Sequence, residues 1–350
     1  MLFACTACAV TGKQASQYDF SSVDGLINRW VERNYYPGAS ISIANEDGTL
    51  FEKSYGNYTA DKEVYVASCG KWVAVAVIGY VVDNTPLDWN DEIKRWLPEF
   101  SNDVKGTITL RQLCSHTSGI PDYHKKPKMD VYNRLDSAVM DILPLDTVFT
   151  PGSRFQYGGL AMQIAGRMAE VAMKDNFENI FQSHIAIPLE MNHSHFLPVD
   201  MAEGHNPMLG GAFKTTLNDY MHFLNMIFHD GEYEGTRILS KKVVKEMQAN
   251  QIGNAEIPKG EYVETALGET HNGIYGLGQW REKVDENDNA YQISSPSWAG
   301  AYPWINKKDG VYGFFITHVE GNSAIRDNFS PFLNAPLISS AVSKIINTQI

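Results

Sequence analysis

The stretch VASCGKWVAVAVIGYVVDN, residues 66–84, places a serine and a lysine three positions apart at the start of a strongly apolar run. A run that is apolar on every side predicts a helix that is buried all round. On such a helix Ser68 and Lys71 lie on one face, one turn apart, with β-carbons about 5 to 6 Å from each other. Composition alone also produces Ser-x-x-Lys pairs by chance, so the rest of the chain has to supply the context.

The chemistry open to this pair depends on burial. An ordinary lysine has a pKa of about 10.4 and cannot accept a proton at neutral pH. Desolvation disfavours the ammonium form, so a buried Lys71 could take the proton of the Ser68 hydroxyl. The free N–H groups of the helix N-terminus would also stabilise negative charge beside the serine. The stretch therefore predicts a serine nucleophile with a lysine base, against the plainer alternative of a lysine whose stem alone is buried.

Composition narrows the class of protein. The chain has 350 residues, 43% of them hydrophobic and 20% charged, which suits one large folded domain or two intimate ones. Its net charge of −12 argues against a nucleic-acid partner, because such binding needs basic patches. No apolar run reaches the roughly 18 residues of a transmembrane helix. Nothing calls for a cofactor or a metal, since no carboxylate motif accompanies the candidate ligands His193 and His195 with His184 or His205.

The N-terminus carries a separate prediction. Residues 1–20 begin MLFACTACAV, which is apolar and rich in small residues, and then turn polar, like the tail end of a signal peptide. Cys5 and Cys8 are candidate lipid-anchor sites. We therefore expect an extracytoplasmic protein, periplasmic or secreted, with a frayed end of a cytoplasmic chain as the alternative.

The order of the predicted elements indicates the fold class. Residues 21–34 have the spacing of an amphipathic helix and residues 38–59 read as a hairpin, whereas the pattern from about 90 to 245 is mostly helical. Strands return at 275–283, 295–306 and 310–321, and residues 331–350 can supply a last helix. We expect an α+β fold: an antiparallel sheet built from both chain ends, flanked by helices in a three-layer α/β/α lobe, with an inserted all-helical lobe at about 90–245. Residues 21–350 would form one catalytic domain with a ligand cleft between the lobes.

Two further segments could complete a site around Ser68. In PGSRFQYGG, residues 151–159, a tyrosine held near a lysine could pass a proton to a leaving group. In SWAGA, residues 297–301, small residues on a predicted strand would let the backbone approach a bound carbonyl. Pro303 predicts that this is an edge strand, free to present N–H groups to substrate.

With these segments the chain resembles the serine β-lactamase and penicillin-binding-protein-like superfamily, in the branch of class C β-lactamases, D-Ala-D-Ala carboxypeptidases and family VIII carboxylesterases. The Ser-x-x-Lys pair is one of that family's motifs. TLRQLCSHTSGIPDY (109–123), PGSRFQYGG and LGGAFKTTLNDYMHFLNMI (209–227) resemble others, in the same order. The resemblance implies Ser68 as the acylated nucleophile, Lys71 as its base and Tyr157 as a partner in proton transfer. The backbone N–H groups of Ser68 and Ala301 would form the oxyanion hole.

Two departures from the family pattern bear on the substrate. Gly159 stands where an asparagine usually binds the substrate amide, and Trp298 stands where a lysine or histidine usually helps to hold a carboxylate. With Gly300 they are the predicted substrate-binding residues. A site without that amide and that cation favours small neutral esters, so a carboxylesterase is our first expectation.

Other functions of the same fold stay open. A D-Ala-D-Ala carboxypeptidase, a D-amino-acid peptidase or a weak class C-type β-lactamase would need another cation, and a catalytically silent penicillin-binding-like protein would not need Ser68, Lys71 and Tyr157 together. The fold would place Cys69 and Cys114 near the floor of the site. There they would either pair in an oxidising compartment or remain two small buried thiols.

Overall fold

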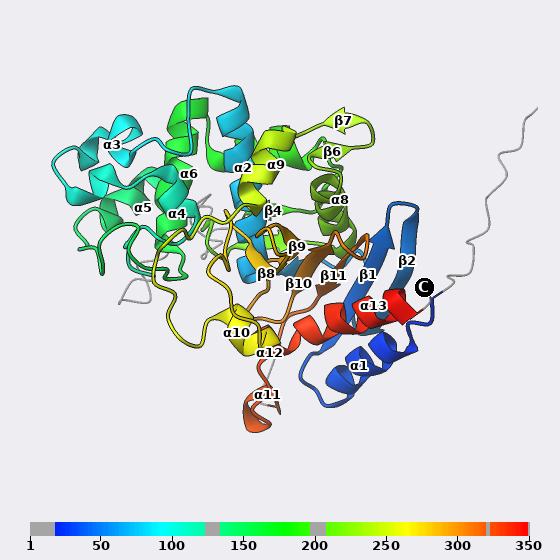
Figure 1. Ribbon diagram of the computed structural model, residues 1–350. Helices are drawn as coiled ribbons and strands as arrows, with labels where there is room; N and C mark the ends of the chain where they lie inside the picture. Colours follow the sequence, from blue (N-terminus) through cyan, green and yellow to red (C-terminus); the bar gives the residue numbers. More distant parts are fainter. Residues whose placement is uncertain (1–17, 123–133, 197–207, 320–322, 349–350) are drawn as a thin grey trace, which may run out of the picture.

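The computed structural model of the protein describes residues 18–122, 134–196, 208–319 and 323–348 (Figure 1). Cys5, Cys8 and nearly all of the predicted signal-like segment lie outside the described residues, so the lipid anchor and the extracytoplasmic location stay predictions. Among the helices that the structure describes, none combines the length and the apolar character that a membrane span requires.

A six-stranded sheet forms the centre of the larger lobe, in the order β2-β1-β11-β10-β9-β8. All of its neighbouring strands pair antiparallel. The strands are β1 (Gly38–Asn45), β2 (Gly48–Gly56), β8 (Trp280–Val284), β9 (Ala290–Ser294), β10 (Tyr302–Asn306) and β11 (Val311–Ile316). The sheet therefore joins the two ends of the chain, because β1 pairs directly with β11, and this confirms the predicted antiparallel architecture.

Helices cover both faces of this sheet. On one face lie α1 (Ser21–Glu32) and α13 (Pro336–Thr348), which contact each other and share a core with the sheet (Figure 1). The buried side chains of α1 are Val23, Ile27 and Trp30, the one-sided spacing of an amphipathic helix. On the other face α8 (Leu217–Phe228) contacts β1, β10 and β11. The result is the expected α/β/α arrangement of three layers.

The apolar stretch of residues 66–84 becomes the central helix of the molecule, α2 (Gly70–Asn84). Its side chains are buried from Lys71 to Ile78 without interruption, so it has no solvent face along that length. It packs within the second core, between the sheet and the helical lobe. Both predictions made for this stretch, a helix and burial on all sides, are confirmed.

The segment between β2 and β8 contains the second lobe, and it is mostly but not wholly helical. It contains a three-stranded sheet ordered β3-β5-β4 and a two-stranded one, β6-β7. The expectation of an all-helical insert is therefore wrong in this detail. Its physical reason is that the chain entering α2 needs backbone partners: β3 pairs with β5, and Val66 N–H donates to Phe213 O at 2.9 Å. The short strands are β3 (Val64–Tyr65), β4 (His195–Phe196), β5 (Phe213–Thr215), β6 (Glu232–Tyr233) and β7 (Thr236–Arg237).

The remaining helices of the described chain are short, except for α6. They are α3 (Ile93–Trp96), α4 (Leu110–Cys114), α5 (Leu135–Ile142), α6 (Leu160–Met173), α7 (Phe177–Phe181), α9 (Lys241–Gln248), α10 (Tyr262–Leu267), α11 (Ser323–Arg326) and α12 (Pro331–Asn334).

Two expectations about residues 295–306 are corrected. Residues 297–301 form a turn that precedes β10, because Gly300 has φ +105° and its N–H donates to Ser297 O at 3.0 Å. The strand that follows is not at an edge, since β10 lies between β11 and β9. Pro303 is tolerated there because pairing with β9 begins only at Trp304.

Candidate active site

Ser68 lies in a single 3-10 turn, Ala67–Cys69, that leads directly into α2. The preceding residue, Ala67, has φ +46°, a left-handed conformation that an alanine rarely adopts. Such strain persists only where the surroundings fix it, and it is concentrated at functional sites. Ser68 itself is 7% exposed, so its hydroxyl is held at the edge of the core rather than on open surface.

The Lys71 amine contacts this hydroxyl. Lys71 Nζ donates to Ser68 Oγ at 3.1 Å, and it also donates to the backbone oxygen of Gly210. The lysine is fully buried in the first turn of α2. The two side chains that the sequence places one helical turn apart therefore point toward each other.

Burial determines the charge of this amine. Desolvation lowers the pKa of Lys71 to about 7, and the nearby Cys69 raises it only in part. None of the ion pairs in the described part of the chain includes Lys71, in contrast to the buried Lys105, whose Nζ pairs with Asp103 Oδ2 at 2.8 Å. A substantial fraction of Lys71 is therefore uncharged at neutral pH and able to accept a proton.

Tyr157 lies beside the amine. Lys71 Nζ is 4.5 Å from the centre of the Tyr157 ring. Three other aromatic rings enclose that tyrosine: His116 at 4.7 Å, Trp280 at 5.2 Å and Tyr275 at 6.0 Å between ring centres. Burial, reinforced by Lys71, holds the pKa of His116 well below its usual value, so this imidazole is neutral. The phenol thus sits in an apolar setting next to the Ser68–Lys71 pair.

Two glycines lie where the helical lobe meets the Ser68–Lys71 pair. Gly159 is the N-cap of α6, and a β-carbon on Gly210 would lie only 2.6 Å from Gly159 Cα. This close approach is possible because neither residue has a side chain. It places the Gly210 carbonyl where Lys71 donates to it.

Three side-chain hydrogen bonds hold the Ser68 turn in place. Cys69 Sγ donates to Ala301 O at 3.4 Å, Ser295 Oγ donates to Ser68 O at 3.1 Å, and Tyr220 OH donates to Cys69 O at 2.7 Å. The first two bonds fix the turn against the segment of residues 295–301, and the third fixes it to α8. In the described part of the chain, no backbone carbonyl accepts from the Ala301 N–H.

A narrow cavity of about 100 Å³ opens over Ser68. Two of the predicted substrate-binding residues, Gly159 and Trp298, line it, and Trp298 is 56% exposed. The third, Gly300, is not among the lining residues, because its left-handed turn packs against the Tyr36 ring. The described residues that line the cavity are all uncharged: Tyr65, Ala67, Ser68, Gly159, Leu160, Gln163, Met208, Gly210, Gly211 and Trp298.

The sequence analysis did not predict most of the residues that line this cavity. Gly210 and Gly211 belong to the quoted LGG segment, so their motif was visible although their position was not. Tyr65, Leu160, Gln163 and Met208 carry no pattern that distinguishes them from core residues. They become recognisable only when the two lobes are placed together.

Two further expectations concern the cysteines and the candidate metal ligands. Cys69 and Cys114 are free buried thiols, so of the two alternatives the structure shows the second. Burial raises the pKa of both thiols. Across the described ranges no cluster of three or more His, Cys, Asp or Glu side chains could hold a metal ion, and His205 lies outside those ranges.

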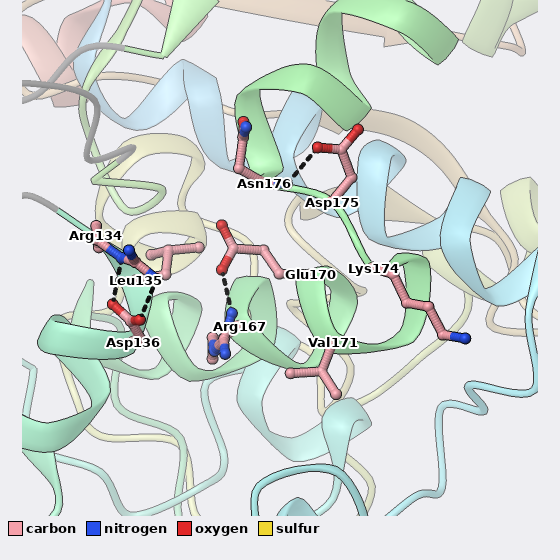
Figure 2. Close-up of a pocket in the computed structure, with 9 residues that line it drawn as sticks. All are labelled: Arg134, Leu135, Asp136, Arg167, Glu170, Val171, Lys174, Asp175 and Asn176. Carbon is pink, nitrogen blue, oxygen red and sulfur yellow. Dashed lines mark hydrogen bonds and ion pairs between the residues drawn. The ribbon is translucent and has the colours of Figure 1, made fainter.

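A larger hollow of about 630 Å³ lies elsewhere, beside α5 and α6 (Figure 2). Four of its charged groups form two ion pairs, Arg134 Nη2 with Asp136 Oδ2 at 2.6 Å and Arg167 Nη1 with Glu170 Oε2 at 2.9 Å. The described residues that line it include no serine, threonine, cysteine or histidine. We therefore assign the candidate active site to the smaller cavity, where the Ser68 hydroxyl lies next to the desolvated Lys71 amine.

Comparison with known proteins identifies the family and the fold. A family profile described as Beta-lactamase matches residues 23–330. A crystal structure from Bacteroides dorei, provisionally described as a β-lactamase, is 60% identical with a TM-score of 0.91, covering 95% of this chain and 100% of that one. EstCE1, a hydrolase with promiscuous acyltransferase activity, has a TM-score of 0.70 at 16% identity, covering 90% of this chain and 97% of that one, and shares the fold.

A curated relative matches only part of the chain. Protein flp of Staphylococcus aureus is 26% identical over 197 residues, 53% of this chain. That match spans 40% of the length of the relative.

Proposed function

Since the chain belongs to the β-lactamase family, we propose that it is a serine hydrolase that forms an acyl-enzyme on Ser68 and acts as a carboxylesterase on small neutral esters. The observation that carries this proposal is the combination of a desolvated Lys71, bonded to Ser68 Oγ at 3.1 Å, with a cavity lined by uncharged residues. The base makes the serine reactive, and the described residues that line the cavity offer no charged partner for a charged substrate.

Each group has one role in the proposed reaction. Ser68 Oγ attacks the ester carbonyl and transfers its proton to Lys71 Nζ. The N–H groups of Ser68 and Ala301 stabilise the oxygen that becomes negative. As the bond to the alcohol breaks, the proton passes from Lys71, with Tyr157 as partner, to the leaving oxygen. Water then attacks the acyl-enzyme by the same route in reverse and frees Ser68.

The alternative substrates on this fold carry a carboxylate. A D-Ala-D-Ala peptide or a β-lactam needs a cation near the reacting carbonyl, and the position beside Gly300 is occupied by Trp298. His318 lies against that tryptophan, with ring centres 5.6 Å apart, and is the group that a peptidase or β-lactamase would recruit. We rank these activities second.

A substrate panel tests the proposal. We expect p-nitrophenyl acetate or butyrate to be hydrolysed with a kcat/KM at least about tenfold above that for nitrocefin or a D-Ala-D-Ala peptide, because burying an unpaired carboxylate in this cavity is unfavourable. The measurement is initial-rate kinetics on all four compounds at one pH. Fastest turnover of the peptide or of nitrocefin would replace the esterase assignment by the corresponding alternative.

Trp298→Lys tests why carboxylates are disfavoured. The new cation should raise the ratio of nitrocefin to ester kcat/KM by about threefold to tenfold, the effect of a charge-assisted bond at a partly exposed position. Ile187→Lys, at a residue that is 67% exposed and outside the cavity, adds the same charge as a control and should leave the ratio unchanged. Equal ratios in both variants would show that Trp298 does not select against anions.

A further inference from the structure

The strained turn that carries Ser68 is held from outside by groups that the proposed reaction does not use. Ala67, directly before the nucleophile, has φ +46°. An alanine costs free energy in this left-handed region, so the turn relaxes toward a right-handed conformation unless its surroundings prevent it. The contacts that maintain the strain therefore also position Ser68 Oγ.

Two side-chain hydroxyls bind successive backbone carbonyls of the turn. Ser295 Oγ donates to Ser68 O at 3.1 Å, and Tyr220 OH donates to Cys69 O at 2.7 Å. These carbonyls belong to the two peptide groups that follow the Cα atom of Ser68. Because a peptide group is planar, a bond to its oxygen restrains the orientation of the whole group. The two bonds together limit rotation of the backbone on the C-terminal side of Ser68.

The other side of the turn is fixed independently. Val66 N–H donates to Phe213 O at 2.9 Å, next to the pairing of β3 with β5. The strained Ala67 thus lies between one backbone bond and two side-chain bonds. Removal of either hydroxyl would loosen one side of the turn while the other side stays in place.

Both hydroxyls are carried by buried residues. Tyr220 lies on α8 and is fully buried, and its ring stacks on Phe314 with ring centres 4.4 Å apart. Burial, with Cys69 nearby, raises the pKa of Tyr220 well above its ordinary value, so the hydroxyl keeps the proton that it donates. Ser295, just after β9, is 2% exposed. Neither residue is among the described residues that line the cavity.

We propose that Tyr220 and Ser295 are positioning residues, whose hydroxyls hold the strained Ser68 turn so that Ser68 Oγ stays bonded to Lys71 Nζ, and that neither touches the substrate. This inference rests on the proposed function and adds two residues to it. Acylation of Ser68 should then depend on both residues more strongly than binding does, because a displaced nucleophile loses rate while most of the cavity wall stays in place.

Tyr220→Phe removes one oxygen atom and keeps the stacked ring. We expect the maximal rate constant for fluorophosphonate labelling and the kcat/KM for p-nitrophenyl acetate to fall by about tenfold. The fluorophosphonate concentration that gives half the maximal rate should change by less than about threefold. Ser295→Ala should lower both rates by about threefold to tenfold, and it tests the proposal even if Tyr220→Phe fails to fold. The measurements are intact mass against time and initial rates.

Ala67 supplies a readout that a loss of stability alone would not give. Glycine adopts the left-handed region freely, so in an Ala67→Gly background the turn no longer has to be held against relaxation. The loss caused by Tyr220→Phe should therefore shrink from about tenfold to at most about threefold when the double variant is compared with Ala67→Gly.

Tyr312→Phe is the matched control. Tyr312, on β11, also joins α8 through its hydroxyl, but it accepts from Asn225 Nδ2 at 2.8 Å and not from a group of the Ser68 turn. This variant loses one hydrogen bond of a buried tyrosine, as Tyr220→Phe does, so both should unfold at similarly lowered temperatures. Only Tyr220→Phe should be labelled more slowly.

The outcomes distinguish this inference from the proposed function. If the parent protein is labelled and hydrolyses the ester while Tyr220→Phe or Ser295→Ala keeps the parent rates, the inference is wrong and the proposed function stands. An equal loss in Tyr312→Phe, or a loss that stays undiminished in the Ala67→Gly background, would also overturn it. If the parent is neither labelled nor active, the proposed function fails and this inference with it.

Discussion

Replacing Ser68 by alanine is expected to abolish covalent acylation and to lower ester kcat/KM by at least about 10⁴-fold, as removal of a nucleophile does in other serine hydrolases. The reason is chemical, because no other hydroxyl is bonded to Lys71 Nζ among the described residues. Water would have to attack the bound ester without forming an intermediate. Intact-mass measurement after exposure to a fluorophosphonate gives the direct readout: a mass increase of one adduct for the parent protein and none for the variant.

The Ser68→Ala experiment has a simple control. Ser101→Ala changes an exposed serine in a turn outside the cavity and should label fully. Labelling of Ser68→Ala at the parent level would place the nucleophile elsewhere. A parent protein that is not labelled by a fluorophosphonate, a penicillin or an ester would instead support the catalytically silent alternative.

The elements that carry this chemistry were predictable because their patterns are local. The α2 run is apolar at every position for two turns, and the 38–56 hairpin alternates around a turn, so each specifies its structure without tertiary information. The proximity of Ser68 to Lys71 followed from a helical spacing, whereas their expected roles also needed the other motifs and the family resemblance. Their hydrogen bond needs only the helix between them.

Elements whose core residues are polar were missed. The strand β9 was not expected, because its buried positions include Gln292 and Ser294. Both donate to the buried Glu282, at 2.6 and 2.5 Å, so polar groups satisfy one another inside the sheet. The strand β9 therefore lacks the alternation of apolar and polar residues by which a strand is predicted from sequence.

The cavity walls were missed for a different reason. The contact of Gly210 with Gly159 joins segments that are far apart in the chain, and it exists only after the lobes have packed. Gln163 resembles any polar residue of an amphipathic helix until Leu209 orients it. The turn at Gly300 likewise depends on the Tyr36 ring from the N-terminal part of the chain. Local patterns predicted the contact between Ser68 and Lys71, whereas the cavity walls depend on tertiary packing.

The activity should depend on pH through Lys71. The neutral amine is the form that accepts the Ser68 proton, and burial lowers its pKa to about 7. Ester kcat/KM should therefore rise with pH, by about tenfold per unit well below pH 7, and level off above about pH 8, a gain of about 100-fold between pH 5 and 8. A lysine with an ordinary pKa would instead place this rise near pH 10.

The neighbours of the amine do not produce such a rise. The pKa of His116 is held well below its usual value and that of the Cys69 thiol well above, so neither changes charge near pH 7. The measurement is kcat/KM for a neutral ester from pH 5 to 9, corrected for spontaneous hydrolysis.

Substitution of the lysine assigns the pH dependence to one residue. Lys71→Arg keeps a cation that cannot lose its proton, so we expect a loss of at least about 10³-fold and no rise near pH 7, because the base is absent at every pH. Lys105→Met removes the buried lysine that pairs with Asp103 and should leave the pH dependence of the parent. A rise near pH 7 that survives in Lys71→Arg would mean that another group is the base. In that case the bond between Lys71 and Ser68 would be structural, and the explanation of reactivity by a desolvated amine would be wrong.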